Sequence, residues 1–466
     1  MIHYCQGTKK KIFKIKILIL LLATVSPLFT LNTEVRAEAK SIVKTESFLV
    51  KDSLKLFAAV PTPTPAQTNY TFNDLVLLTK SQNYQVQQEA ERVFQARKKV
   101  KGAILNLLPH IRARSILAFA FTGWTGLIDA AGDLLPFLFP SNWFKARAEK
   151  RLETAELFAF SSLRGNELFD VETLYYSYAR DRMLAQLIDQ HLNWYEEVMK
   201  RLQAEELAGT LPTGSADYFQ VNALKLKEDR SNLTEMLWIE RLSLVQAAAL
   251  EPTNNGIDFE MLTPTSLEGA KVLDSTLFQS PAVSKSFELK ALDEIVTAST
   301  LTRSAIWFSY LDPSAEQAIG FGMGAPIEIS RSQTHALEIL RASTESLIQQ
   351  KVVDSTLLFN ESITRFDLAK AESSSIQREM IRHIERHDAG DSETDPTKFV
   401  DQLSSLENDV LIFELNKLSQ QFRAMIAQAR LNRLTLQGIY SDLEPIATAV
   451  EKKPDENEDN PDENIP

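Results

Sequence analysis

The segment AGTLPTGSADYFQV, residues 208–221, decides the fold because it interrupts two stretches of charged, helical sequence with two glycines and a proline. Gly209, Pro212 and Gly214 would end one long helix and turn the chain. Ser215 or Asp217 could then cap the helix that returns. The segment therefore predicts the tip of a helical hairpin.

Proline placement predicts two unusually long helices. No proline occurs between Pro140 and Pro212, and none occurs between Pro326 and Pro396. Apolar residues recur in these segments at spacings of three and four, with charged residues between them, as an amphipathic helix requires. A helix from near Phe144 to near Leu207 would be on the order of 95 Å long, which is too long for a compact domain.

Shorter helical segments flank each long one, and the order of elements repeats. Residues 72–108 and 216–250 surround the first long helix; residues 280–305 and 398–437 surround the second, at about 332–388. Two shorter helices stacked end to end would match one long helix in length. SQNYQVQQEAERVFQARKKV resembles SPAVSKSFELKALDEIVTAS, and Phe219 after the first tip corresponds to Phe399 after the second. The sequence therefore predicts an internal duplication.

The chain divides into six parts by composition. KKKIFKIK followed by ILILLLATV and VRAEA predicts a secretory signal peptide over residues 1–39. A linker rich in proline and threonine (40–69) precedes the first repeat (70–252), and a connection (253–279) leads to the second repeat (280–444). The acidic segment 445–466 has the composition of a disordered tail.

The stretch QAIGFGMGAPIEIS alternates strictly between apolar and small or polar residues, which predicts a strand. Its apolar face would meet lipid in a transmembrane barrel, where about 9 to 11 residues cross the membrane. HIRARSILAFAF alternates more weakly. Two such regions cannot close a sheet alone, so several chains would share one barrel. The expected lipid-facing residues are Ile319, Phe321, Met323, Ile327 and Ile329.

Composition argues against several function classes. The chain has 466 residues and a net charge of −12, with no basic stripe of the kind that binds nucleic acid. Its one cysteine, Cys5, lies in the signal peptide. HIERH places His383 and His387 on one helical face, but the glutamate stands at the wrong position for a metalloprotease and no third ligand is evident. We therefore expect no enzyme activity, cofactor or metal.

Taken in order, these features resemble the TolC family of outer-membrane efflux and secretion channels. The resemblance covers residues 70–437 and rests on FNDLVLLTKSQNYQV, the step LLPHI from helix to strand, the duplicated halves and the tip GTLPTGSAD. It implies a mainly α fold with a few strands: antiparallel helical hairpins form a periplasmic α-barrel, and a homotrimer shares one outer-membrane β-barrel. A periplasmic adaptor (membrane fusion) protein and an inner-membrane transporter are the implied partners.

The resemblance also implies site residues. Adaptor docking falls on Gly209, Thr210, Leu211 and Pro212 of the first tip and Gly390 of the second; the pore mouth falls on Asp217 and Asp401. Residues 110–144 depart from the family pattern, and either a short strand near Pro136 to Phe144, a membrane-surface hairpin or a rim plug fits them. A periplasmic coiled-coil scaffold without a barrel is the alternative function. Drug efflux and protein secretion both remain open.

Overall fold

The computed structural model describes residues 69–108, 137, 139–251, 257–310, 324–389 and 396–443. The chain separates into two units, Met1–Ala66 and Gln67–Pro466, and every described element belongs to the second. The segments expected to be a signal peptide, a linker and an acidic tail lie wholly or almost wholly outside the described residues. Within the described ranges, no helix combines the length and apolar character needed to cross a membrane.

Long helices dominate the described unit. Helix α7 (Pro140–Ala208) has 69 residues and α11 (Gly324–Asp388) has 65. Their returning partners are α8 (Ser215–Ala247) and α12 (Pro396–Thr435). At about 1.5 Å per residue, α7 is roughly 100 Å long, in accord with the expected helix over 144–207. The predicted returning segments 216–250 and 398–437 agree with α8 and α12 to within a few residues.

The predicted segment 72–108 is two helices, α3 (Phe72–Gln82) and α4 (Tyr84–Leu105), and 280–305 is also two, α9 (Thr276–Lys285) and α10 (Phe287–Ser309). One residue makes each break. Asn83 (φ −56°, ψ 130°) accepts hydrogen bonds from the amides of Gln85 and Val86, and Ser286 (φ −53°, ψ 122°) accepts one from Leu289. Each polar side chain thus caps a new helix where extended backbone ends the previous one.

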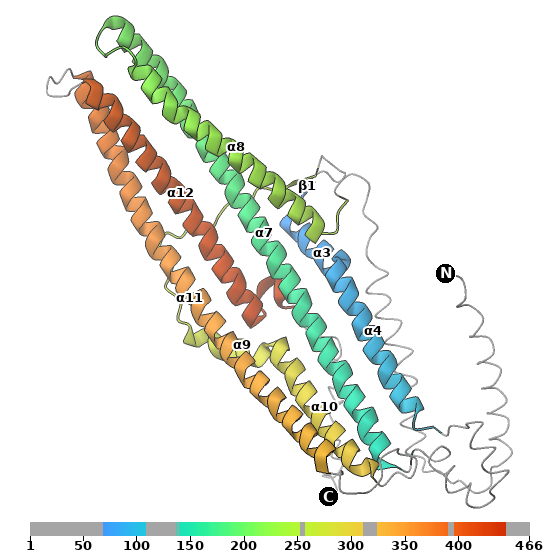
Figure 1. Ribbon diagram of the computed structural model, residues 1–466. Coiled ribbons are helices and arrows are strands. Elements are labelled where there is room, and N and C mark those ends of the chain that lie inside the picture. The colour runs from blue at the N-terminus through green and yellow to red at the C-terminus, as the bar shows by residue number, and fades with distance from the viewer. Residues whose placement is uncertain are drawn as a thin grey trace, which may run out of the picture. The chain divides into compact units, whose positions relative to one another are not determined.

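The helices form two antiparallel hairpins with the shorter helices alongside (Figure 1). Helix α7 packs against α8, α4, α10 and α12, and α11 packs against α12, α10 and α9. Strands β1 (Asn69–Tyr70) and β2 (Asp258–Phe259) pair in parallel, and the 3-10 helix η2 (Gly438–Tyr440) follows α12. Taken side by side, α7, α10 and α12 lie in the middle of the unit, α8 with α3 and α4 forms one edge, and α11 forms the other.

Two features hold the middle of the unit together. Leu75, Tyr175, Leu244 and Phe259 belong to one buried cluster that joins α3, α7 and α8 to β2. Buried Glu172 accepts hydrogen bonds from the hydroxyls of Tyr176 and Tyr440, at 2.7 and 2.5 Å. Burial raises the pKa of Glu172, although both hydroxyls oppose that shift. These contacts fix the chain after α12 onto α7.

Part of the strand prediction is wrong. Ile327 and Ile329 lie in the first turns of α11, which begins at Gly324, so a strand through them does not form. Pro326 is compatible with this because a proline in the first helical turn sacrifices no intrahelical hydrogen bond. Ile319, Phe321 and Met323 lie outside the described residues, as does the weaker strand at 110–121.

The alternative of a short strand near Pro136 to Phe144 is likewise corrected, because α7 begins at Pro140. Pro140 occupies the first helical position, where its fixed φ favours helix and its missing N–H costs nothing. Residues 109–136 lie outside the described ranges. The amphipathic pattern of 144–207 thus extends backward to the proline.

Candidate docking tips and channel residues

The first tip is a tight turn held by backbone geometry. Gly209 ends α7 in the left-handed conformation, with φ +77°, and Gly214 precedes α8 with φ +96°. The amides of Gly209 and Thr210 donate to the carbonyls of Glu206 and Glu205, each at 3.0 Å, which satisfies the last carbonyls of α7. Leu211 is buried, whereas Pro212 is exposed. The predicted glycine turn is confirmed.

The predicted cap of α8 is wrong. Neither Ser215 nor Asp217 caps the helix: Ser215 Oγ donates to the carbonyl of Pro212 at 2.8 Å, and Asp217 is exposed in the first turn. Instead Glu206, from the end of α7, accepts from the amide of Ala216 at 2.7 Å. A carboxylate at a helix N-terminus is favourable, so a side chain from across the turn supplies the cap.

The second tip joins α11 to α12. Gly390 and residues 391–395 lie outside the described residues, whereas the last turn of α11 and the first turns of α12 lie within them. Buried His383 donates from Nε2 to the carbonyl of Phe399 at 3.1 Å, and His387 stacks on the ring of Phe399 with a centroid distance of 3.7 Å. Both histidines of HIERH therefore have structural contacts at the start of α12.

Charged side chains link the two tips. His387 Nε2 contacts Glu205 Oε2 at 2.9 Å, and Arg201 pairs with both Glu205 and Asp388. Burial alone would raise the pKa of Glu205, but the hydrogen bonds from His387 and Arg201 outweigh it and lower that pKa. The end of α7 is thereby tied to the end of α11.

The two residues expected at a pore mouth, Asp217 and Asp401, occupy different settings. Asp217 is exposed on α8, and Asp401 is exposed on α12. Asp401 accepts a hydrogen bond from the hydroxyl of Tyr218 at 2.5 Å, and this bond raises the pKa of Tyr218. Asp401 thus ties α12 to α8 close to the first tip, a contact that the sequence did not indicate.

Beneath the tips, an apolar cluster joins both hairpins. Phe219 of α8 contacts Tyr195 of α7 with tilted rings, 4.7 Å between ring centroids, and both pack with Phe399, Val400 and Leu403 of α12. Phe219 and Phe399, matched in the sequence comparison, therefore share one core. The tips are positioned by this core as well as by their turns.

A buried ionic cluster was not predicted. His191 of α7 is 9% exposed; its Nδ1 lies 2.5 Å from Glu407 Oε1 and its Nε2 lies 3.5 Å from Glu414 Oε2, both on α12. Burial lowers the pKa of His191, but the two carboxylates more than compensate and raise it to about 9. Protonated His191 therefore bridges the hairpins. A single histidine in a helical pattern gives no signal of such partners.

A second unpredicted network crosses three helices. Arg433 Nη2 of α12, buried, donates to Ser162 O, Asn166 Oδ1 and Glu288 Oε1 at 3.0, 3.0 and 2.9 Å. Burial opposes ionisation of Glu288, yet Arg433 and the other donors lower its pKa. Gly165 makes room for this arginine, since a Cβ there would lie 2.8 Å from Arg433 Cζ and closer still to Nε. A glycine inside a long helix was the available signal.

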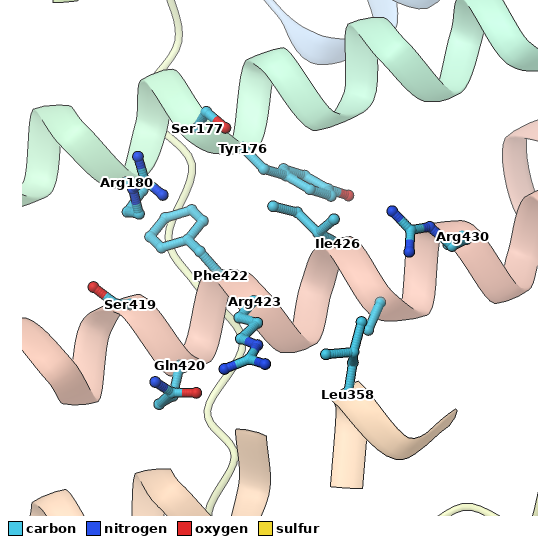
Figure 2. Close-up of a pocket in the computed structure, with 11 residues that line it drawn as sticks. Tyr176, Ser177, Arg180, Leu358, Ser419, Gln420, Phe422, Arg423, Ile426 and Arg430 are labelled. Carbon is cyan, nitrogen blue, oxygen red and sulfur yellow. The ribbon is translucent and has the colours of Figure 1, made fainter. Parts of the chain in front are cut away.

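A groove of about 260 Å³ lies where α7, α11 and α12 meet. Figure 2 shows Tyr176 and Arg180 on α7 facing Phe422, Ile426 and Arg430 on α12. Arg180 pairs with Asp181, and Arg423, at the same groove, pairs with Glu361. Because carboxylates engage these two guanidinium groups, we assign the groove no ligand.

No protein-family model and no curated protein matches the chain. Several solved structures match the chain in fold. CusC, described with transmembrane channel formation, aligns with TM-score 0.64 at 9% identity over 79% of this chain and 92% of its own. The Campylobacter jejuni CmeC outer membrane channel gives 0.61 at 11% over 82% and 91%, and the open Neisseria gonorrhoeae MtrE outer membrane channel gives 0.61 at 13% over 80% and 90%.

The chain has the TolC-type fold. The agreement extends over nearly the whole of each solved channel, so the order of long and short helices is shared rather than one hairpin alone. The expected fold class is confirmed in its mainly helical part. The two tips lie at one end of the described helices, and the last turns of α4 and α10 lie at the other end with the first turns of α7 and α11 (Figure 1).

Proposed function

We propose that this protein is an outer-membrane channel: a passive exit duct, rather than an enzyme, that works as a homotrimer with a periplasmic adaptor and an inner-membrane transporter. The observation that carries the proposal is the shared fold, in which long continuous helices pair with shorter stacked ones along nearly the full length of solved outer-membrane channels.

Two exposed apolar edges support the trimer. Large apolar side chains are exposed along α8 and along α11, which flank the lateral order of helices; they are Val221, Leu224, Met236, Ile239 and Leu242 on α8, and Ile339, Leu340, Leu347, Leu357 and Leu368 on α11. Exposed apolar surface of this kind marks interfaces. If the α11 edge of one copy packs on the α8 edge of the next, the contact is head-to-tail, and a rotation of about 120° per copy closes it into a ring of three.

The repeated helix breaks support the duplication. Asn83 and Ser286 occur at the same place in the two halves, each ending one short helix and capping the next. The two long helices also differ by only four residues in length, 69 against 65. We propose that each half arose from one ancestral unit of short helices, membrane segment, long helix and returning helix.

The tips fit the proposed adaptor site. Leu207 is 91% exposed beside Gly209, and Thr210 and Pro212 are exposed with it. An exposed leucine in the last turn of a long helix offers an apolar anchor without a large ordering cost. We propose that Gly209, Thr210, Leu211, Pro212 and Gly390 shape this docking surface, Leu211 from within, and that Asp217 and Asp401 face the closed mouth.

Membrane fractionation followed by native mass measurement tests the proposal directly. The expected result is recovery from the outer membrane with three times the mass of the mature chain. A soluble periplasmic monomer would contradict it and favour the coiled-coil scaffold.

The barrel has a separate test at residues 319–323. Met323→Arg, on the expected lipid face, should impair membrane assembly by about 2 to 4 kcal/mol per chain if the residue lies near the midplane. Gly322→Ser, on the opposite face, should be milder. Equal recovery of both variants in the membrane fraction would count against a strand at this position.

A further inference from the structure

One end of the helical unit carries a concentrated positive charge. The last turns of α4 and α10 and the first turns of α7 and α11, residues 95–108, 298–310, 140–151 and 324–335, contain ten lysines and arginines but only two acidic residues, Glu149 and Glu328. Phe144 of α7 stacks on Phe308 of α10, and Ser299 of α10 contacts Thr334 of α11, so these segments lie together. We call them the basic collar.

The charge reverses immediately beyond the collar. The adjoining segments 83–94, 152–163, 286–297 and 336–347 contain nine acidic residues and three basic ones. The whole chain has a net charge of −12, so the charge of the collar is opposite in sign to that of the chain as a whole. At about 1.5 Å per residue, twelve residues give the collar a depth of roughly 18 Å along the helices. The positive charge is therefore a local band.

Several lysines of the basic collar are exposed to solvent. The described part of the chain supplies no carboxylate partner for Lys98, Lys99, Lys145 or Lys150, and all four are exposed. Lys98 Nζ lies over the ring of Phe94 at 4.8 Å. Elsewhere in the collar Arg97 and Arg151 are engaged, with Glu153 and Glu294 of the acidic band. Most of the lysine charge thus faces outward.

Two exposed tryptophans lie in the same band. Trp143 is 39% exposed and donates from Nε1 to the carbonyl of Phe137 at 2.7 Å; Trp307 is 53% exposed and stands edge-on to Phe308. Tryptophans with one wet and one apolar side are enriched where proteins meet the surface of a bilayer. A surface that carries both tryptophan and lysine side chains is typical of contact with lipid headgroups.

We propose that the basic collar binds the anionic phospholipid headgroups of the leaflet that faces the helices. This inference rests on the proposed function, because an outer-membrane barrel formed by residues 109–136 and 311–323 would place the collar directly at that leaflet. Clustered lysines beside a membrane attract anionic lipids over about one Debye length. The tip end lacks this bias, since segments 195–208, 215–226, 377–389 and 396–408 hold ten acidic and seven basic residues.

Quenching of tryptophan fluorescence by brominated lipids tests the collar. The full chain, carrying Trp124→Phe so that the membrane signal comes from Trp143 and Trp307, is reconstituted with brominated phosphatidylglycerol or brominated phosphatidylcholine. We expect roughly threefold to tenfold preference for phosphatidylglycerol at low salt, falling at high salt. The combined variant Lys98→Gln, Lys99→Gln, Lys145→Gln and Lys150→Gln should bring this ratio close to one.

Four lysines at the tip end provide the matched control: Lys200, Lys225, Lys227 and Lys398, each changed to Gln, should leave the lipid preference unchanged. Equal quenching of the unsubstituted collar by both lipids would overturn the inference while leaving the membrane position intact. Absence of quenching by either lipid would instead contradict the proposed barrel. A preference retained in the collar variant would also overturn the role of these lysines.

Discussion

Gly165→Ala should loosen the junction of α7, α10 and α12, although alanine normally favours helix. The new Cβ would lie 2.8 Å from Arg433 Cζ and closer to Nε, so the guanidinium must move. That group donates to Ser162, Asn166 and Glu288, and moving it weakens these contacts. Because the side chain of Glu288 is 36% exposed, the loss corresponds to a charge-assisted hydrogen bond, about 1.5 to 3 kcal/mol, and alanine recovers about 1 kcal/mol of helix propensity.

The expected net loss is therefore about 0.5 to 2 kcal/mol, or roughly 2- to 30-fold in the local opening equilibrium. Hydrogen exchange followed by mass spectrometry measures this as faster exchange in peptides from the ends of α12 and α10. Gly102→Ala in α4 is the control, because a Cβ added at Gly102 would have no atom within 4 Å. If Gly165→Ala leaves exchange unchanged or slows it, as expected for Gly102→Ala, the close approach of Arg433 does not matter.

Three further outcomes follow from the tips and the hairpin interface. Because the pKa of His191 is raised to about 9, protonated His191 adds to the free energy of unfolding, by on the order of 3 kcal/mol at most. This stabilisation is fully present below pH ~6.5 and is lost as pH rises through about 9. His191→Gln should remove this pH dependence of stability, as measured by unfolding followed by circular dichroism. Asp401→Asn should lower the cation selectivity of reconstituted channels, whereas Asp459→Asn should not, and unchanged single-channel selectivity would exclude a ring of Asp401. Gly209→Val should weaken adaptor pull-down without changing trimer formation, since Gly209 has φ +77°; normal pull-down would exclude a docking role.

The sequence predicted the helices better than it predicted strands. Proline-free amphipathic stretches locate α7 and α11, and glycines locate the first tip, because periodicity and backbone freedom are local properties. Alternation failed at Ile327 and Ile329, since six alternating residues fit the first turns of a helix as well as a strand. Short alternating runs need their partners before they can be distinguished.

The contacts between hairpins were beyond prediction. Tyr218 meets Asp401 across 183 positions, and His191 meets Glu407 across 216, so neither sequence neighbourhood contains the partner. Local patterns also misassigned the cap of α8 to Ser215 or Asp217, because Glu206 approaches only after the turn has formed. Side-chain chemistry at the tips depends on tertiary packing, whereas the tip itself does not.

The breaks at Asn83 and Ser286 let each short-helix pair change angular phase while α7 and α11 continue unbroken. An uninterrupted α-helix drifts by about 20° per heptad from a fixed seam, so two very long straight helices lose register with each other. One residue with extended backbone, Asn83 or Ser286, ends the first short helix, so the next helix can begin at a new angle about its axis. Above and below each break, the two short helices can therefore pack at different angles against the same unbroken long helix.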